Sequence, residues 1–418
     1  APDNSDGILN SPVTWADFEN NLRKALGTDA KLGANKAVFD IGDGNGFATL
    51  CGLITCDWIE ASEDEKLPKK VILKIPSILP IKKLNDSLPD DHKMFNFGEE
   101  QWIAMEAEMI QIHNTEVVSY EFTEEFEGLT MPKKYYSILA EPGTSGQLCL
   151  EYKENTRTMN FYEKHSVEQL RQIARALGKV QACSLKKEPT NPQLNNDLFS
   201  KMDEMWPLET FRGMFKGLAT IDNSEKTLAL LEKVDVLVEK YYASNLAISI
   251  PKQMGFRPVL VNGDMHTGNV LIDSNSGDLV SLIDWQLTHI GVGVEDLHRI
   301  AMSALMTEER RASMPILIEV MYESLVENLD GTEPPYTLEK LHLISDLIFP
   351  QCSIFLTCAF LAFISKIMKD PKLTDEEKSE RKDVMLDKVI GALEDLVEID
   401  EKNKKHMEDL NLKLKLKA

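Results

Sequence analysis

The sequence lacks closely spaced cysteine pairs. Six cysteines are scattered along its 418 residues, none of them in a Cys-x-x-Cys pair, and several lie in apolar runs. Structural zinc sites use such pairs, so no zinc site is expected. Isolated cysteines in apolar surroundings are typical of a reducing compartment. We therefore predict a cytoplasmic protein with reduced thiols at Cys51, Cys56, Cys149, Cys183, Cys352 and Cys358.

Positive charge is also scarce. The chain has 46 basic and 68 acidic side chains, which gives a formal net charge of −22. Such a surface repels nucleic acid and anionic membranes, so neither is expected as a main partner. The first six residues lack a basic start and an apolar core, and we expect no signal peptide. The length predicts two or three structural units with ordinary globular composition.

Only one apolar run is long enough to raise the question of a membrane span. It covers residues 347–364, is interrupted by Pro350, Gln351 and Ser353, and is closely bracketed by charged residues. A transmembrane helix needs about 20 predominantly apolar residues. We predict instead a buried helix within a large helical part of the protein.

One group of residues is a candidate catalytic site: Asp264, Asn269 and Asp284. Two short β-prone runs, residues 270–273 and 279–283, flank a turn-rich segment that contains glycine. This pattern predicts a β-hairpin. Because a hairpin doubles the chain back, Asn269 before it and Asp284 after it are expected to face one space large enough for a metal ion.

The spacing of these three residues is the one that kinase-type phosphoryl transfer requires. Asp264 can orient and deprotonate an acceptor hydroxyl, and Asn269 and Asp284 can hold Mg²⁺ against the phosphates of a nucleotide. Asp and Asn are also frequent in ordinary loops, which is the alternative interpretation. The hairpin and the second aspartate together favour the functional one.

Three glycines alternate on a turn between two β-prone runs: Gly42, Gly44 and Gly46. Glycine lets backbone N–H groups approach phosphate oxygens because no Cβ stands in the way. The pattern fails as a dinucleotide-binding fingerprint, since a strand follows where a helix should begin. A plain hairpin turn remains the alternative.

Lys74 favours the nucleotide interpretation. It lies among apolar residues in a predicted strand, where a kinase places the lysine that contacts the α- and β-phosphates and pairs with a helix glutamate. An exposed strand lysine is the alternative. Helical periodicity from residue 98 to about 126 supplies the glutamate, for which Glu116 is favoured over Glu106 and Glu108.

The order of these elements resembles the choline kinase and aminoglycoside phosphotransferase branch of the protein-kinase-like fold. More narrowly, it resembles the ecdysteroid-kinase-like (CHK kinase-like) proteins of nematodes and insects. The resemblance covers residues 36–365 and is strongest at residues 262–269 and at Ile283-Asp284-Trp285. The sequence His113-Asn114-x-Glu116 resembles the helix segment of that group, which is the reason for preferring Glu116.

The resemblance implies an α+β, two-lobed fold, with a small and mostly antiparallel β N-lobe (residues 1–140) and a mainly helical C-lobe (residues 141–418). It implies ATP and Mg²⁺ as cofactors, Asp264 as catalytic base, and Asn269 and Asp284 as metal ligands. The implied nucleotide-binding residues are Gly42, Gly44, Gly46, Lys74, Glu116 and, at the linker between the lobes, Leu139 and Glu141.

The sequence departs from the family pattern where Asn262 replaces the histidine that most members have two residues before the catalytic aspartate. Asparagine can still hydrogen-bond the loop backbone, so activity is expected to survive. Asp296 matches an acidic position that braces the catalytic loop in this fold. His266 is interpreted as a loop brace, with a catalytic role as the alternative.

No activation segment or Ala-Pro-Glu element follows Asp284, and a helical insert at residues 190–250 takes its place. A small-molecule hydroxyl acceptor is therefore favoured over a protein, and steroid, glycoside and amino-alcohol acceptors stay open. A catalytically silent nucleotide-binding protein is the main alternative, and a redox enzyme built on the glycine turn is a third. Oligomeric state and the choice between ATP and GTP stay open.

Overall fold

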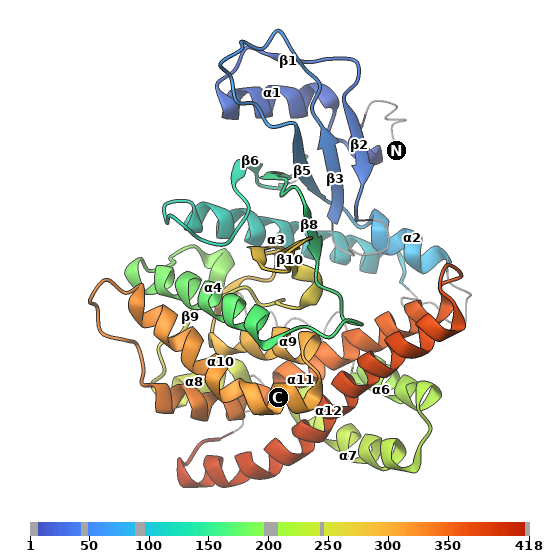
Figure 1. Ribbon diagram of the computed structural model, residues 1–418, viewed down its shortest axis with the longest axis vertical. Coiled ribbons are helices and arrows are strands. Elements are labelled where there is room, and N and C mark those ends of the chain that lie inside the picture. The colour runs from blue at the N-terminus through green and yellow to red at the C-terminus, as the bar shows by residue number, and fades with distance from the viewer. Residues whose placement is uncertain are drawn as a thin grey trace. The chain divides into compact units, whose positions relative to one another are not determined.

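A computed structural model describes residues 7–42, 49–87, 97–141, 143–195, 208–242 and 246–413 (Figure 1). The chain divides into two compact units. The first comprises Ala1–Glu127, Met131–Glu154 and Trp285–Leu287, and the second comprises Gly128–Thr130, Asn155–Asp284 and Thr288–Ala418.

The first unit is built on a five-stranded antiparallel sheet with the strand order β2-β3-β5-β7-β6. Buried and partly exposed residues alternate along β3, as expected for a strand with one face on a core. That core includes Phe18 and Leu22 from α1 and Leu73 from the central strand. The strands are β2 (Ala37–Asp40), β3 (Thr49–Thr55), β5 (Lys70–Pro76), β6 (Lys134–Ile138) and β7 (Gln147–Glu151).

Helices accompany this sheet. The helix α1 begins at a capping box, in which the Thr14 hydroxyl accepts the N–H of Asp17 at 3.1 Å. The long helix α3 carries His113, Asn114 and Glu116 on its buried second half. The remaining elements of this unit are η1 (Ile8–Asn10), α1 (Trp15–Leu26), β1 (Lys31–Leu32), β4 (Trp58–Ile59), α2 (Leu79–Ser87) and α3 (Glu99–Thr123).

The second unit is mainly helical, with α4 packed on α10 and α11 packed on α12 (Figure 1). Its helices are α4 (Val167–Lys186), η3 (Pro192–Asn195), α6 (Leu208–Ile221), α7 (Glu225–Tyr242), α8 (Leu246–Gln253), η4 (Thr267–Asn269), α9 (Val294–Ala304), α10 (Thr307–Glu327), α11 (Leu338–Lys369) and α12 (Asp375–Asp409). Short strands complete it: β8 (Thr156–Thr158), β9 (Val259–Val261), β10 (Val270–Asp273), β11 (Leu279–Leu282) and β12 (His289–Gly291).

The apolar run predicted to be a buried helix lies in α11. By length and composition this helix could cross a membrane, but 82% of its most apolar window is buried inside the protein. The predicted α+β fold class is confirmed, with an antiparallel sheet in the first unit and a mainly helical second unit.

The sheet contains one strand that the sequence analysis did not anticipate. The strand β7 follows Gly143 and pairs with both β5 and β6. As a result, the first unit continues to Glu154. The position predicted as the boundary, between residues 140 and 141, lies between two neighbouring strands of one sheet.

Candidate active site

The predicted hairpin positions two of the candidate site residues. The strands β10 and β11 are antiparallel, with Val270 opposite Leu282. One step further, the N–H of Ile283 donates to the carbonyl of Asn269 at 2.9 Å. Asn269 and Asp284 therefore lie at the same end of the hairpin, as its sequence predicted.

Asp264 and Asn269 are connected by a hydrogen bond. The side-chain Nδ2 of Asn269 donates to the backbone carbonyl of Asp264 at 2.8 Å and approaches its Oδ2 at 3.4 Å. Both contacts use Nδ2, so the other polar atom of the amide, Oδ1, takes no part in them. An amide oxygen is a suitable ligand for Mg²⁺.

Asp284 has a backbone conformation that is rare outside glycine. Its φ angle is +62°, in the left-handed region. Non-glycine residues in this region are strained and are enriched at functional sites. The side chain of Asn262 donates to the carbonyl of Asp284 at 2.9 Å, which helps to hold this conformation.

The Asn262 side chain forms hydrogen bonds with the backbone of both Asp264 and Asp284. Its Oδ1 accepts the N–H of Asp264 at 3.0 Å, and its Nδ2 holds the Asp284 carbonyl. The side chain is fully buried, so these bonds are shielded from water. The asparagine that departs from the family pattern therefore does bond the loop backbone, as the sequence analysis expected.

Asp296, near the start of α9, braces the same loop. Its carboxylate accepts the N–H of Asn262 at 2.7 Å and the N–H of Gly263 at 2.9 Å. Gly263 has a φ of +86°, which a side chain would strain. Burial raises the pKa of Asp296 to about 6, so the carboxylate is ionised at neutral pH and accepts both bonds.

The environment of Asp264 suits a proton acceptor. Burial raises the pKa of its carboxyl group, and the neighbouring Asp284 raises it further, while His266 and Arg299 oppose this shift. The side chain keeps 32% of its surface exposed. A raised pKa brings a carboxylate closer to neutral pH, where a general base is most effective.

His266 supports the loop. Its Nδ1 accepts the N–H of Gly268 at 3.1 Å and so caps η4, the short helix that precedes β10. Its Nε2 lies 3.9 Å from Oδ2 of Asp264. The bond within the loop agrees with the interpretation of this histidine as a brace.

The donor set fits a divalent cation shared with phosphates. Within the part of the chain that the structure describes, no group of three or more His, Cys, Asp and Glu side chains is placed to hold a metal ion. Mg²⁺ needs only one or two carboxylates when phosphate oxygens and waters complete its octahedron. Burial chiefly, and the nearby Asp284 in addition, raise the pKa of Asp264, and a divalent cation would relieve the repulsion between the two carboxylates.

In the first unit, Lys74 and Glu116 form an ion pair. Lys74 Nζ lies 2.5 Å from Glu116 Oε2, with only 11% and 2% of the two side chains exposed. The other carboxylate oxygen, Oε1, accepts the N–H of Trp285 at 3.2 Å. Glu106 is exposed and Glu108 is partly exposed on the same helix, so of the three candidates it is Glu116 that pairs with Lys74.

Gly42 is the one residue of the glycine turn within the described residues, and Gly44 and Gly46 lie outside them. The N–H of Gly42 donates to Oδ1 of Asp40 at 2.9 Å. A Cβ atom added to Gly42 would come within 3.3 Å of Cys51, which is opposite Lys74 in the sheet. The turn therefore begins close to the strand pair that carries Lys74.

The predicted linker position is wrong. Leu139 and Glu141 lie in the turn between β6 and β7, where the N–H of Glu141 bonds the carbonyl of Thr144 at 3.2 Å and its carbonyl accepts the N–H of Thr144 at 2.9 Å. Asn114 bonds both the N–H and the carbonyl of Ala140, at 2.8 and 3.0 Å. These residues connect two strands of one sheet rather than the two units.

Apart from Gly128–Thr130, the chain enters the second unit after β7, at Glu154–Asn155. The sequence did not reveal β7, because Pro142 and Gly143 are as compatible with the end of a sheet as with a hairpin turn to a further strand. The signal that could have revealed the further strand is the apolar run Leu148-Cys149-Leu150 within β7.

Comparison with known proteins identifies the family. A family model, DUF1679, described as "Uncharacterized oxidoreductase dhs-27", matches residues 2–404. The chain belongs to this family. The protein of that name from Caenorhabditis elegans is 26% identical over 278 residues, which cover 62% of this chain and 31% of the relative. The chain thus spans about a third of the length of this curated relative.

Two solved structures that align with most of this chain are named as a choline kinase and a putative aminoglycoside phosphotransferase. The choline kinase from Cryptosporidium parvum Iowa II aligns with a TM-score of 0.46 and 11% identity, over 91% of this chain and 92% of that chain. A putative aminoglycoside phosphotransferase from Ralstonia eutropha aligns with a TM-score of 0.46 and 10% identity, over 92% and 97% of the two chains.

Proposed function

We propose that the protein is an ATP-dependent phosphotransferase that transfers the γ-phosphate to a hydroxyl group of a small molecule. The observation that carries this proposal is the bonded arrangement of Asp264, Asn269 and Asp284. Asn262 bonds the backbone of both aspartates, and the hairpin bonds Asn269 to the residue before Asp284. Phosphoryl transfer depends mainly on positioning and on charge neutralisation, which such an arrangement supports.

Asp264 is the proposed catalytic base. Its carboxylate would accept a hydrogen bond from the acceptor hydroxyl, orient the oxygen toward the γ-phosphate and take the proton as the new bond forms. The raised pKa of the carboxyl group favours this transfer. Asn269 and Asp284 would hold Mg²⁺, which supplies charge neutralisation at the phosphates.

Lys74 is the proposed ligand of the α- and β-phosphates. Because Glu116 lies 2.5 Å from Lys74 Nζ and is itself bonded to a backbone N–H, it fixes the direction of the lysine side chain. Gly42, Gly44 and Gly46 are proposed to cover the phosphates. The linker after β7, rather than Leu139 and Glu141, is the proposed place for backbone contacts to the adenine.

The resemblance to ecdysteroid-kinase-like proteins supports an acceptor of the steroid, glycoside or amino-alcohol type. The name of the curated relative describes a protein of which the match covers 31%, so that name does not assign redox chemistry to this segment. Six free cysteines, five of them buried, support the proposed cytoplasmic location.

The test combines binding and turnover. Mg²⁺ and ATP together should raise the melting temperature of the protein more than ATP with EDTA. Labelled ATP with a metabolite extract should then yield a phosphorylated product in the wild type and none with Asp264→Asn, which should keep the thermal shift. Equal product formation by wild type and Asp264→Asn would refute the assignment. Binding without any product would favour the catalytically silent alternative.

A further inference from the structure

Lys388 is a buried lysine far along the chain from the proposed site. It lies on α12, and only 1% of its surface is exposed. A buried ammonium group is costly unless its donors are paired. All three N–H donors of Lys388 can be satisfied, because Nζ lies 2.8 Å from the carbonyl of Phe161, 2.6 Å from that of Glu163 and 3.0 Å from that of Ser303.

Ser303 links this lysine to the catalytic loop, here defined as residues 262–269. The hydroxyl of Ser303 accepts the N–H of Thr267 at 3.2 Å, while its carbonyl accepts Lys388. Asp296, two turns earlier on α9, holds Asn262 and Gly263 at the other end of the same loop. The helix α9 therefore fixes the catalytic loop at two points.

The second point lies at the C-terminus of α9. The last carbonyls of a helix have no partner within the helix, and a cation there is favourable because of the helix dipole. Lys388 bonds the carbonyl of Ser303, and the N–H of His165 bonds the next carbonyl, that of Ala304, at 3.3 Å. Lys388 thus fixes the last turn of α9, from which Ser303 reaches Thr267.

The same lysine holds the segment 159–165, whose first residue bonds the strand that follows the loop. The N–H of Met159 donates to the carbonyl of Val270, the residue after Asn269, at 3.1 Å. Lys388 bonds the middle of the segment through the carbonyls of Phe161 and Glu163. The segment and the catalytic loop are therefore connected through one ammonium group.

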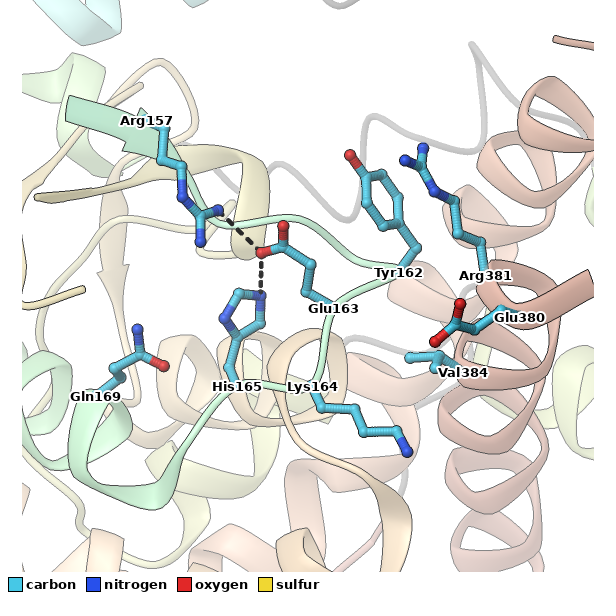
Figure 2. Close-up of a pocket in the computed structure, with 9 residues that line it drawn as sticks. All are labelled: Arg157, Tyr162, Glu163, Lys164, His165, Gln169, Glu380, Arg381 and Val384. Carbon is cyan, nitrogen blue, oxygen red and sulfur yellow. Dashed lines mark hydrogen bonds and ion pairs between the residues drawn. The ribbon is translucent and has the colours of Figure 1, made fainter. Parts of the chain in front are cut away.

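Side chains of this segment line a recess of about 520 Å³ (Figure 2). Arg157, Glu163 and His165 point toward one another there, with Arg157 Nη1 2.9 Å and His165 Nε2 3.7 Å from the Glu163 carboxylate. Arg381 of α12 stacks on Tyr162, its guanidinium carbon 4.0 Å from the ring centroid. The carbonyls bound by Lys388 thus belong to the turn that forms a wall of the recess.

Contacts on either side of Lys388 fix its position on α12. The carboxylate of Asp387 accepts the N–H of Thr307 at 2.8 Å, and its carbonyl accepts the Thr307 hydroxyl at 2.8 Å. One turn later, Gly391 lets α12 pack closely against Thr307, so that a Cβ added to this glycine would lie 1.9 Å from Thr307 Oγ1. The reach of Lys388 to α9 is therefore set by the packing of the helix.

We propose that Lys388 is a positioning residue for the catalytic loop, acting on Thr267 through the last turn of α9. The inference rests on the proposed function only in naming this loop catalytic. The bonds themselves predict that the backbone of the loop is protected from hydrogen exchange in the free protein, whatever reaction it carries out.

Lys388 is a charged group whose protonation depends on its burial. Burial lowers the pKa of its amine to about 7, although Asp387 and Glu163 oppose the shift. His165, whose pKa burial lowers, and the charged side chain of Arg157 also lie nearby. The ammonium form can donate all three of these bonds, whereas a neutral amine could donate only two.

The experiment is hydrogen–deuterium exchange on the full chain, read by mass spectrometry and corrected for the intrinsic rate. At pH 6, Lys388→Met should lower the protection of residues 262–270 and 159–165 at least tenfold, and Lys388→Arg should restore part of it. The matched control is Lys240→Met, which removes the 2.6 Å bond to Asp400 on the same helix, far along it from Lys388.

Unchanged protection of both segments in Lys388→Met would overturn the proposal, and so would an equal loss throughout the helices of the second unit. If Lys388→Met does not fold, Ser303→Ala decides the matter, because it removes the hydroxyl that accepts the N–H of Thr267. Its protection at residues 262–270 should fall severalfold, and an unchanged value would overturn the proposal. Neither measurement needs ATP or an acceptor, so a failure of the proposed phosphotransfer would leave this test intact.

Discussion

Replacing Asn262 with alanine should weaken the protein at its proposed catalytic loop. The side chain makes two bonds, to the N–H of Asp264 and to the carbonyl of Asp284, and is fully buried. Asn262→Ala would leave both backbone groups without this partner. Each buried group that loses its partner costs about 1–3 kcal/mol, so for the two groups the free energy of unfolding should fall by roughly 2–6 kcal/mol.

Urea unfolding, followed by tryptophan fluorescence and circular dichroism, measures this change. Asn275→Ala is the matched control, because Asn275 is exposed in the turn of the nearby hairpin. That control should stay within about 0.5 kcal/mol of the wild type. Asn262→His restores the residue that the family pattern has at this position, and it should recover part of the stability if its ring can reach either backbone group.

Asn262→Ala should also respond less to the nucleotide. Because the Asn262 amide helps to hold the left-handed conformation of Asp284, its loss should also reduce the Mg²⁺-dependent stabilisation by ATP. If Asn262→Ala matched the Asn275→Ala control in both urea midpoint and nucleotide stabilisation, the proposed role of Asn262 as the link between the two aspartates would be refuted.

Three further predictions concern buried groups. Lys74→Met should lower the free energy of unfolding by about 3–5 kcal/mol, because it leaves the Glu116 carboxylate buried without its cation. A loss below about 1 kcal/mol, measured by urea unfolding, would contradict this. The pKa of Asp296 is raised to about 6, so as pH falls the folded state binds a proton at a higher pH than the unfolded state. The free energy of unfolding should therefore rise as pH falls from 6 to 4. Asp296→Asn should abolish this rise. Gly391→Ala should lower the melting temperature because its Cβ would collide with Thr307, whereas a rise would show that helix propensity dominates.

Local patterns predicted the parts of the site that are close in sequence. The hairpin between Asn269 and Asp284 could be recognised because two β-prone runs flank a glycine-containing turn, and a hairpin of that length has few possible geometries. The partner of Lys74 was harder to predict, since a helix offers a glutamate at several positions. The motif around His113 and Asn114 led to Glu116, and the structure pairs it with Lys74.

Other parts could not be predicted because the sequence signal was ambiguous or absent. Pro142 and Gly143 are compatible with the end of a strand and with a hairpin turn, and the wrong choice moved the expected linker by one strand. Lys388 gave no signal at all, because a single lysine in a helix is usually exposed. Its burial depends on where α12 packs against α9, which no local pattern specifies.

The strain at Asp284 shows why the distant contacts matter. A left-handed non-glycine residue costs about 1–3 kcal/mol and persists only when its surroundings determine its conformation. On one side, the N–H of Ile283 is bonded to Asn269, and on the other side the carbonyl of Asp284 is bonded to Asn262. Asn262 is in turn held by Asp296 of α9. Because the strain is opposed by bonds from the hairpin, the loop and a helix, removing any one of them should loosen Asp284 before it unfolds the unit.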